Sequence, residues 1–367
     1  MSSMFSLTKR IGVDLGTVNS LVWVQGSGIV LNEPTVVAIS LRDNRVVAVG
    51  TMAKNMLGRT PGNILTSRPL KNGVIADYSV TEAMLKFFLQ KVMGRGMLFK
   101  PEVMVSVPAG STQVERRAVL DATLAAGARR AYLIDEPLAA IIGAGIAIAE
   151  ANGNMVLNIG GGMAEASVVS LGGVVATKGV RVGGSTFDEA IQKFVRKKYG
   201  VIIGDTTAEM VKMKIGSAMP SIQNQKNSAE KLVEKSEEKI AEKSEGTTTG
   251  KSTEIQVKGR DVTQGLPKEI TITSADVSEA IQKPLHAILD MVKKVLEEVP
   301  PELASDIIDK GLVMTGGSVM LDQLGPWISQ EIGIPVSLAD EPLLCVIKGI
   351  GVVLDDLEVY RHVLVEK

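Results

Sequence analysis

Short alternating runs of apolar and polar residues open the chain. Ile11, Val13 and Leu15 alternate with small or polar residues, residues 16–19 contain a glycine, and residues 21–24 are apolar again. Alternation on both sides of a short turn predicts a β-hairpin. The pattern returns at 155–171, where three consecutive glycines separate two apolar runs. Two similar hairpins in different halves of the chain predict two related α/β domains that face one another.

Segments with helical periodicity follow the hairpins. Residues 80–93 and 114–126 carry apolar residues at helical spacing, and an apolar strand at 103–107 precedes the second of them. Strands that alternate with helices predict a largely parallel sheet that is covered on both faces. Further helices are predicted at 186–199, 207–215 and 274–299. Pro284 predicts a kink in the last of these, or its division into two helices.

One polar segment, 221–252, interrupts this pattern. It is nearly free of large apolar residues and contains the near-repeat EKLVEKSE followed by EKIAEKSE. A period of eight residues drifts by about 80° per repeat around a helix, so Leu232 and Ile240 do not form a continuous apolar face. We interpret the segment as a solvated helix or a flexible insertion, and the alternative is an arm that binds a partner.

Composition narrows the classes of protein that remain. The chain has 367 residues, of which 45% are hydrophobic and 22% charged, so it is long enough for two domains and is not globally disordered. A net charge of −1 and an aromatic content of 3% argue against a nucleic-acid partner. One cysteine and two histidines exclude a disulfide framework and a His-rich metal centre. No apolar run reaches the roughly 18 residues of a spanning helix, and the first residues lack a secretory signal, which favours a cytosolic protein.

The first glycine turn carries candidate chemistry. Asp14 lies at the end of the first strand, just before Gly16, and Thr17 and Asn19 follow. A glycine lets the backbone approach a phosphate closely, and the carboxylate is suited to a hydrated magnesium ion beside that phosphate. By itself the motif is weak evidence, because many hairpins contain such a turn.

Three further motifs complete the set. The glycines at 160–162 predict a ligand close to the backbone, and the alternative is a sharp bulge. The TGGS run at 315–318 follows an apolar strand, a context that suits a nucleotide base or sugar. Glu136 begins a helix of small residues, either to polarise an attacking water or as an ordinary helix start. The glycines of KGIG at 348–351 predict close helix packing.

In this order the motifs resemble the five-part pattern of the actin, Hsp70 and sugar-kinase superfamily. Within it the chain is most similar to the MreB family of bacterial actins. The segments that carry the resemblance include IGVDLGTVNSLVWVQGSGIVLNEPTVVAI (11–39), YLIDEPLAAIIGAG (132–145), GNMVLNIGGG (153–162) and PPELASDIIDKGLVMTGG (300–317). The resemblance covers nearly the whole chain outside residues 220–252.

The resemblance implies an actin-like ATPase fold of class α/β, with two related domains around a nucleotide cleft and a smaller subdomain on each. The implied boundaries are 9–33, 74–147 and 337–361 for subdomain IA, 34–73 for IB, 148–187 and 273–336 for IIA, and 188–272 for IIB, with the polar insertion 221–252 inside the last.

It also implies ATP or ADP with Mg²⁺ as ligands. The residues that match the family's nucleotide site are Asp14, Gly16, Thr17, Val18 and Asn19 in the first phosphate loop, with Asp14 on the metal; Gly160, Gly161 and Gly162 in the second; Gly316, Gly317 and Ser318 in the adenosine motif; and Glu209 and Lys212 in a helix that reaches the ribose and base. Glu136 matches the glutamate of the hydrolytic water.

Several departures from the family pattern fall on this chemistry. Asn158 stands where the family has an aspartate that faces the metal, and Met163 and Ala164 replace two threonines. Asp135 replaces a glutamate, and Lys214 replaces a glutamate expected near the ribose. Losing one preorganised polar group in an active site costs about 10²–10³-fold in rate. The glycine amides do not depend on these side chains, so we expect nucleotide binding with slow or absent hydrolysis.

The resemblance implies a cytoskeletal protein of cell shape that forms filaments with itself, in paired protofilaments, at the inner face of the cell membrane. It implies other MreB paralogues and membrane proteins of the shape complex as further partners. Leu98 and Phe99, beside Lys100, form a candidate apolar membrane contact, and the alternative is that both are buried. A small-molecule kinase of the same superfamily is the alternative function.

Overall fold

A computed structural model of the chain describes residues 8–43, 45–71, 73–94, 100–219 and 253–367. The chain forms two compact units. The first comprises Met1–Gly184, Ile288–Val319 and Ile332–Lys367, and the second Ser185–Ala287 and Met320–Glu331. The finer division into four subdomains stays a prediction, and the polar insertion 221–252 lies outside the described residues.

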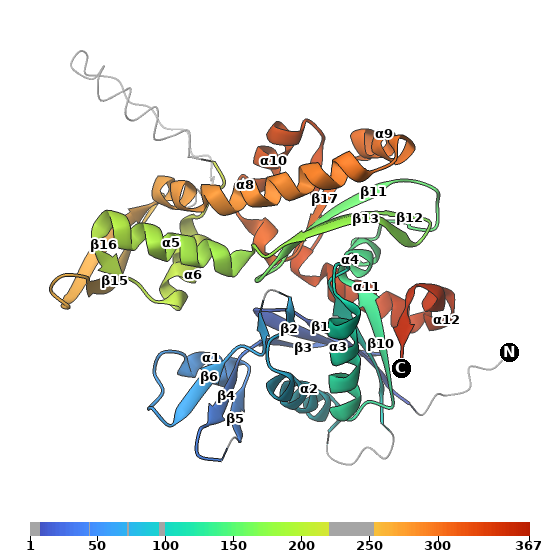
Figure 1. Cartoon of the computed structure of the whole chain (residues 1–367), viewed down its shortest axis with the longest axis horizontal. Helices are drawn as coiled ribbons and strands as arrows, with labels where there is room; N and C mark the ends of the chain where they lie inside the picture. The colour runs from blue at the N-terminus through green and yellow to red at the C-terminus, as the bar shows by residue number, and fades with distance from the viewer. Residues whose placement is uncertain (1–7, 44, 72, 95–99, 220–252) are drawn as a thin grey trace, which may run out of the picture. The chain divides into compact units, whose positions relative to one another are not determined.

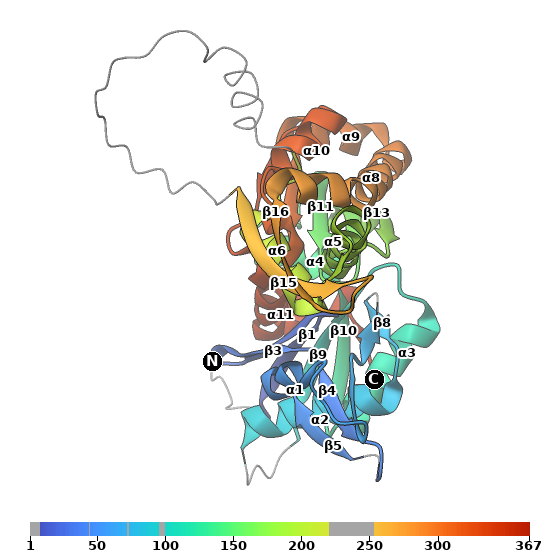
Figure 2. The ribbon, with the colours of Figure 1, turned by 90° about the vertical axis from the view of Figure 1, so that its left-hand side faces the viewer.

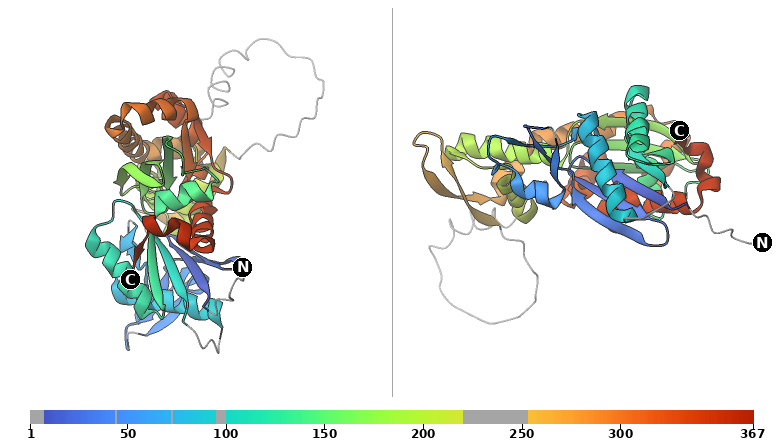
Figure 3. Two further views of the ribbon diagram at one scale, coloured as in Figure 1. Left: turned by 90° about the vertical axis from the view of Figure 1, so that its right-hand side faces the viewer. Right: turned by 90° about the horizontal axis from the view of Figure 1, so that it is seen from below.

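The first unit contains a six-stranded sheet in the order β19-β10-β9-β1-β2-β3 (Figure 1). Its strands are β1 (Arg10–Leu15), β2 (Asn19–Val24), β3 (Gly28–Pro34), β9 (Glu102–Val107), β10 (Arg130–Asp135) and β19 (Val365–Glu366). Strands β1, β2 and β3 form an antiparallel meander, whereas β1, β9 and β10 are parallel. Strand β19 pairs with β10, which brings the C-terminus to that edge of the sheet (Figure 3).

Period-two alternation gives this sheet two buried faces. Ile11 and Val13 belong to a core that includes buried residues of α2 (Tyr78–Met93) and α3 (Gln113–Ala125). Leu21 and Trp23 belong to a second core with α4 (Glu136–Gly143) and α11 (Cys345–Asp355). The predicted covering of both sheet faces by helices is therefore confirmed.

Helices α4 and α11 touch through their backbones. A Cβ placed on Gly349 would lie 1.8 Å from the carbonyl oxygen of Ala139, and one on Gly143 would lie 1.8 Å from that of Cys345. No side chain fits at either position, so glycine sets the distance between the helices. The close packing predicted for the KGIG segment is confirmed.

A second sheet in the same unit has the order β13-β12-β11-β17-β18. Its strands are β11 (Asn154–Ile159), β12 (Ala164–Ser170), β13 (Gly173–Val180), β17 (Leu312–Thr315) and β18 (Val336–Leu338). Again the first three strands are antiparallel and the last two are parallel to β11. The repeat predicted from the hairpins is present. The expectation of a largely parallel sheet was wrong for half of each sheet, because a short turn returns the chain to an antiparallel neighbour.

Smaller elements complete the first unit. They are β4 (Val37–Ser40), β5 (Val46–Val49), α1 (Thr51–Met56), β6 (Ile64–Ser67), β7 (Leu70–Lys71), β8 (Val74–Ile75), α9 (Pro301–Lys310), the 3₁₀ helices η1 (Gly317–Met320), η2 (Pro342–Leu344) and η3 (Arg361–Val363), and α12 (Leu357–Tyr360). Strands β5, β4 and β6 form a separate sheet, and β5 lies beside α2 (Figure 2). The Glu33 carboxylate of β3 links α1 to α2, because it accepts hydrogen bonds from Thr51 of α1 and Lys91 of α2.

The second unit holds α5 (Gly184–Tyr199), β14 (Val201–Ile202), α6 (Asp205–Ile215), β15 (Glu254–Asp261), β16 (Pro267–Thr273), most of α10 (Leu324–Ile332) and the start of α8 (Ser274–Glu298). Helix α8 continues through Pro284, so its predicted division into two helices was wrong. Its fully buried residues Ile281, Leu285 and Ile288 lie on one continuous stripe, and burial of that stripe offsets the lost backbone hydrogen bond. Among the described residues, no helix combines the length and apolar character needed to cross a bilayer.

Candidate functional site

The first glycine turn, between β1 and β2, is hydrogen-bonded to Thr35, which lies outside the turn. The Thr35 hydroxyl donates to the carbonyl oxygen of Gly16 at 2.6 Å, and its amide donates to that of Val18 at 2.8 Å. The buried hydroxyl of Ser20 lies 2.8 Å from the same Thr35 oxygen. The turn therefore has a fixed conformation, and Asn19, predicted as a phosphate-loop residue, begins strand β2 directly after it.

The second glycine turn, between β11 and β12, lies directly against the first. A Cβ on Gly161 would be 2.1 Å from Cγ2 of Val18, and one on Gly162 would be 2.6 Å from Oγ1 of Thr17. The amide of Gly160 donates to the carbonyl oxygen of Met163 and closes the turn. The group that lies against Gly161 and Gly162 is the first turn, and the ligand predicted at these glycines stays a prediction.

Four peptide N–H groups in these turns donate no hydrogen bond to any residue that the structure describes. They are the amides of Thr17, Val18, Gly161 and Gly162. Neighbouring N–H groups without internal acceptors are suited to anions such as phosphate. The arrangement therefore fits the predicted phosphate loops.

The third glycine turn packs against the end of β11. Gly316 has a φ of +91°, and a Cβ there would lie 2.5 Å from the carbonyl oxygen of Ile159 and 2.6 Å from Oδ1 of Asn158. Ser318 donates its hydroxyl to the carbonyl oxygen of Gly160 at 2.8 Å. Gly317, the residue between Gly316 and Ser318, begins the short helix η1. The three motifs predicted as phosphate and adenosine sites therefore come together within the first unit.

Two predicted carboxylates lie in this part of the unit. Asp14 accepts a hydrogen bond from the Ser106 hydroxyl at 3.0 Å, and burial raises its pKa to about 6. Glu136 is the first residue of α4, and its Oε2 accepts from Nδ2 of Asn158 at 3.3 Å. Burial raises the pKa of Glu136 well above its ordinary value, and the negative charges of Asp14 and Glu165 raise it further. A cation near these carboxylates would stabilise their ionised forms.

The departures Asn158 and Met163 have distinct contacts. Asn158 is buried, accepts from the Thr315 hydroxyl at 3.3 Å and donates through its Nδ2 to the Glu136 carboxylate. The Met163 side chain lies beside two glycines: a Cβ on Gly73 would be 2.4 Å from its Sδ, and one on Gly179 would be 3.1 Å from its Cε. Gly73 in turn donates its amide to Oγ1 of Thr17 at 3.0 Å. Both side chains are therefore packed against neighbouring residues of the first unit.

Sequence reasoning missed Glu165, a nearly fully buried carboxylate on β12. It accepts hydrogen bonds from the amides of Ala109 and Gly110, and burial raises its pKa to about 7 despite these bonds. Its signal in the sequence is a single acidic residue inside the otherwise uncharged strand 164–170. Ser106, the partner of Asp14, was also missed, since a serine in a buried strand gives no distinctive pattern.

The remaining predicted residues lie elsewhere. Glu209 and Lys212 are on α6 in the second unit, where Lys212 forms an ion pair with Asp188 at 2.8 Å. Leu98 and Phe99 lie outside the described residues. Within the described ranges, no three or more His, Cys, Asp or Glu side chains gather as a metal site.

Comparisons with known proteins agree on one family. The model of the family described as MreB/Mbl protein matches residues 8–231 and 227–362. The chain is 46% identical to the cell shape-determining protein MreB of Escherichia coli K12, over 97% of this chain and 96% of that one. It is 40% identical to the cell shape-determining protein Mbl of Bacillus subtilis 168, over 95% and 97%. Crystal structures of MreB5 of Spiroplasma citri bound to AMPPNP and to ADP have TM-scores of 0.84 and 0.85 to this structure, at 31% identity over 97% of this chain and 98% of those.

The raised pKa of Glu165 predicts a pH-dependent stability. The ordinary pKa of 4.5 rises to about 7 in the folded protein, so the folded state binds this proton more tightly than the unfolded chain. The resulting stabilisation is present at low pH and is lost as the pH rises through 7. Relative to Glu165→Gln, the free energy of unfolding of the wild type should fall by about 2–3 kcal/mol from pH 5 to pH 8. Urea unfolding without nucleotide or magnesium measures this, and a pH-independent difference would contradict it.

Proposed function

The chain belongs to the MreB/Mbl family, and we propose that it is a nucleotide-binding actin homologue that assembles into filaments involved in cell shape. The observation that carries the proposal is the contact between the two glycine turns, beside which four peptide N–H groups find no acceptor in the described part of the chain. Relatives named for cell-shape determination, and a relative solved with AMPPNP and with ADP, support the same function.

We propose that the phosphates of ATP or ADP bind at the amides of Thr17, Val18, Gly161 and Gly162. These donors belong to the backbone, so the departures at side chains leave them intact. The turn at Gly316 and Gly317 contributes to the adenosine site, and Glu209 and Lys212 are the proposed contacts of the ribose and base. Thr35 keeps the first turn in one conformation, which lowers the entropy cost of binding.

Asp14 is the proposed magnesium residue, with water and phosphate oxygens as the remaining ligands. When bound, the metal supplies charge neutralisation next to the phosphates. Glu136 is the proposed group that accepts a proton from the attacking water. For that it must be ionised and free, whereas here its pKa is raised and its carboxylate is bonded to Asn158. Met163 adds an apolar surface near the turn. We therefore expect slow hydrolysis from the departures at Asn158 and Met163.

Assembly is proposed as head-to-tail addition of copies of this chain, with repeating interfaces that do not close. Paired protofilaments, other family members and membrane proteins of the shape complex are the proposed higher associations, on the resemblance. The proposed location is the inner face of the membrane, with Leu98 and Phe99 as the apolar contact and Lys100 as a neighbouring charge for anionic lipid. The comparisons do not favour the small-molecule kinase alternative.

Nucleotide binding and assembly are tested together. The wild type should bind a fluorescent ATP analogue with magnesium and should pellet above a critical concentration in its presence. Gly162→Ala should weaken nucleotide binding by about tenfold or more, because the added methyl collides with Thr17 and displaces the amides. Gly62→Ala, where nothing lies within 4 Å, is the matched control. A wild type that neither binds nor pellets would refute the proposal.

Hydrolysis is tested by restoring the polar side chains. Asn158→Asp with Met163→Thr should raise the rate of phosphate release by about 100-fold over a slow wild type, since each position supplies a preorganised polar group. Asn152→Asp with Met52→Thr makes the same chemical changes outside the site and should leave the rate unchanged. Equal and fast release by the wild type and the double variant would overturn the interpretation.

Membrane contact is tested with vesicles of phosphatidylglycerol and phosphatidylethanolamine. Leu98→Ser with Phe99→Ser should abolish co-sedimentation of the protein with the vesicles, because burial of two apolar side chains in the interface is lost. Leu41→Ser with Leu65→Ser removes two apolar side chains that are exposed in the structure and serves as the control. Unchanged co-sedimentation of the first variant would eliminate this contact.

A further inference from the structure

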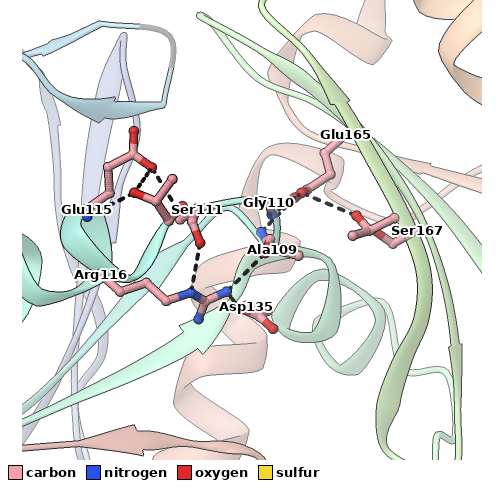
Figure 4. Close-up of polar contacts among 10 residues, drawn as sticks. Ala109, Gly110, Ser111, Glu115, Arg116, Asp135, Glu165 and Ser167 are labelled. Atoms are coloured by element: carbon pink, nitrogen blue, oxygen red, sulfur yellow. Dashed lines mark hydrogen bonds and ion pairs between the residues drawn. The ribbon is translucent and has the colours of Figure 1, made fainter.

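The Glu165 carboxylate connects the two sheets of the first unit. It projects from β12 of the second sheet and accepts the amide N–H of Ala109 at 3.3 Å and that of Gly110 at 3.2 Å (Figure 4). These two amides belong to the turn that follows β9 of the first sheet. The hydroxyl of Thr177 on β13 is a third donor at 3.4 Å. One buried side chain thus links the β12–β13 hairpin of the second sheet to a turn of the first sheet that is distant in the sequence.

The turn that Glu165 holds is itself bonded to the start of α4. The Arg116 guanidinium donates to the carbonyl oxygens of Ala109 and Ser111, at 3.1 and 3.4 Å, and also to the Asp135 carboxylate (Figure 4). Asp135 is the residue directly before Glu136. A continuous path of hydrogen bonds therefore runs from β12, through the 109–111 turn and Arg116, to the residue that precedes the proposed catalytic carboxylate.

Strand β12 has no other polar side chain for this link near the glycine turn. Met163 and Ala164, which precede Glu165, are both apolar and accept no hydrogen bonds through their side chains. A buried carboxylate is costly unless donors surround it, and here two backbone amides and one hydroxyl do so. The negative charge of Asp135 opposes the ionised form, whereas the three donors favour it.

We propose that Glu165 is a positioning residue, whose carboxylate clamps the 109–111 turn to β12 and, through Arg116 and Asp135, holds Glu136 beside Asn158 of β11. This inference rests on the proposed function only for the role of Glu136. The clamp itself is a property of the chain without nucleotide.

Hydrogen–deuterium exchange of the full-length protein tests the clamp at pH 8, where the Glu165 carboxylate is ionised. Glu165→Ala should speed exchange in the segment 108–112 by about tenfold or more, because two amides lose a charge-assisted hydrogen bond. It should also speed exchange in the segment 134–142 at the start of α4. Glu165→Gln, which retains the volume and one acceptor oxygen, should have an intermediate effect and covers the case in which the alanine variant fails to fold. Glu150→Gln changes an exposed carboxylate and is the control.

Catalysis supplies the second readout. In the Asn158→Asp, Met163→Thr background, Glu165→Gln should lower kcat for phosphate release by about tenfold and leave KM for magnesium-ATP within about twofold. The acidic limb of its pH–rate profile should move to lower pH, since Glu136 loses a neighbouring negative charge.

The possible outcomes test the clamp, the positioning role of Glu165 and the proposed function separately. Unchanged exchange in 108–112 would overturn the clamp. Faster exchange there, with both the start of α4 and kcat unaffected, would overturn the positioning role and leave a purely structural bond. A wild type that binds no nucleotide would refute the proposed function, while the exchange pattern in 108–112 and 134–142 would still decide whether Glu165 positions the start of α4.

Discussion

The contact between the two glycine turns is the constraint on which the rest of the site depends. Val18 and Thr17 occupy the space that side chains at Gly161 and Gly162 would need, so the turns approach to a distance that only glycine allows. Beside this contact, four peptide N–H groups have no hydrogen-bond partner among the described residues. Such donors are costly when removed from water unless an acceptor is supplied, which is why the geometry favours an anionic ligand.

Three buried carboxylates lie around the contact between the glycine turns. Asp14, Glu136 and Glu165 all have raised pKa values, chiefly because they are buried, and for Glu136 the like charges add to the effect. A divalent cation would reverse this effect by favouring the ionised forms. Asn158 donates a hydrogen bond to Glu136. On the proposed function, an amide in place of a carboxylate at this position would weaken metal-assisted hydrolysis more than nucleotide binding.

Two kinds of connection hold the site in the first unit. Contacts of the backbone at Gly161 and Gly162 with the side chains of Val18 and Thr17 bring the hairpins of the two sheets together, while other side-chain contacts tie them to their surroundings. Thr35 holds the first turn, Met163 packs at Gly73, and Glu165 bonds to the turn after β9. Neither of the contacts at Gly161 and Gly162 involves the side chain of Asn158 or Met163, so the departures at those two positions do not remove the contact between the turns.

Much of this architecture could be read from the sequence alone. Period-two alternation in 11–24 and 155–171 determined the hairpins, and glycine positions determined the turns, because both patterns reflect local backbone geometry. The family and its nucleotide motifs followed from the order of those turns. Tertiary structure alone decided that the first turn fills the space at Gly161, that Asn158 bonds to Glu136, and that Glu165 reaches the amides of Ala109 and Gly110. These contacts join residues 22 to 143 positions apart, and no local propensity encodes which buried polar groups meet across such distances.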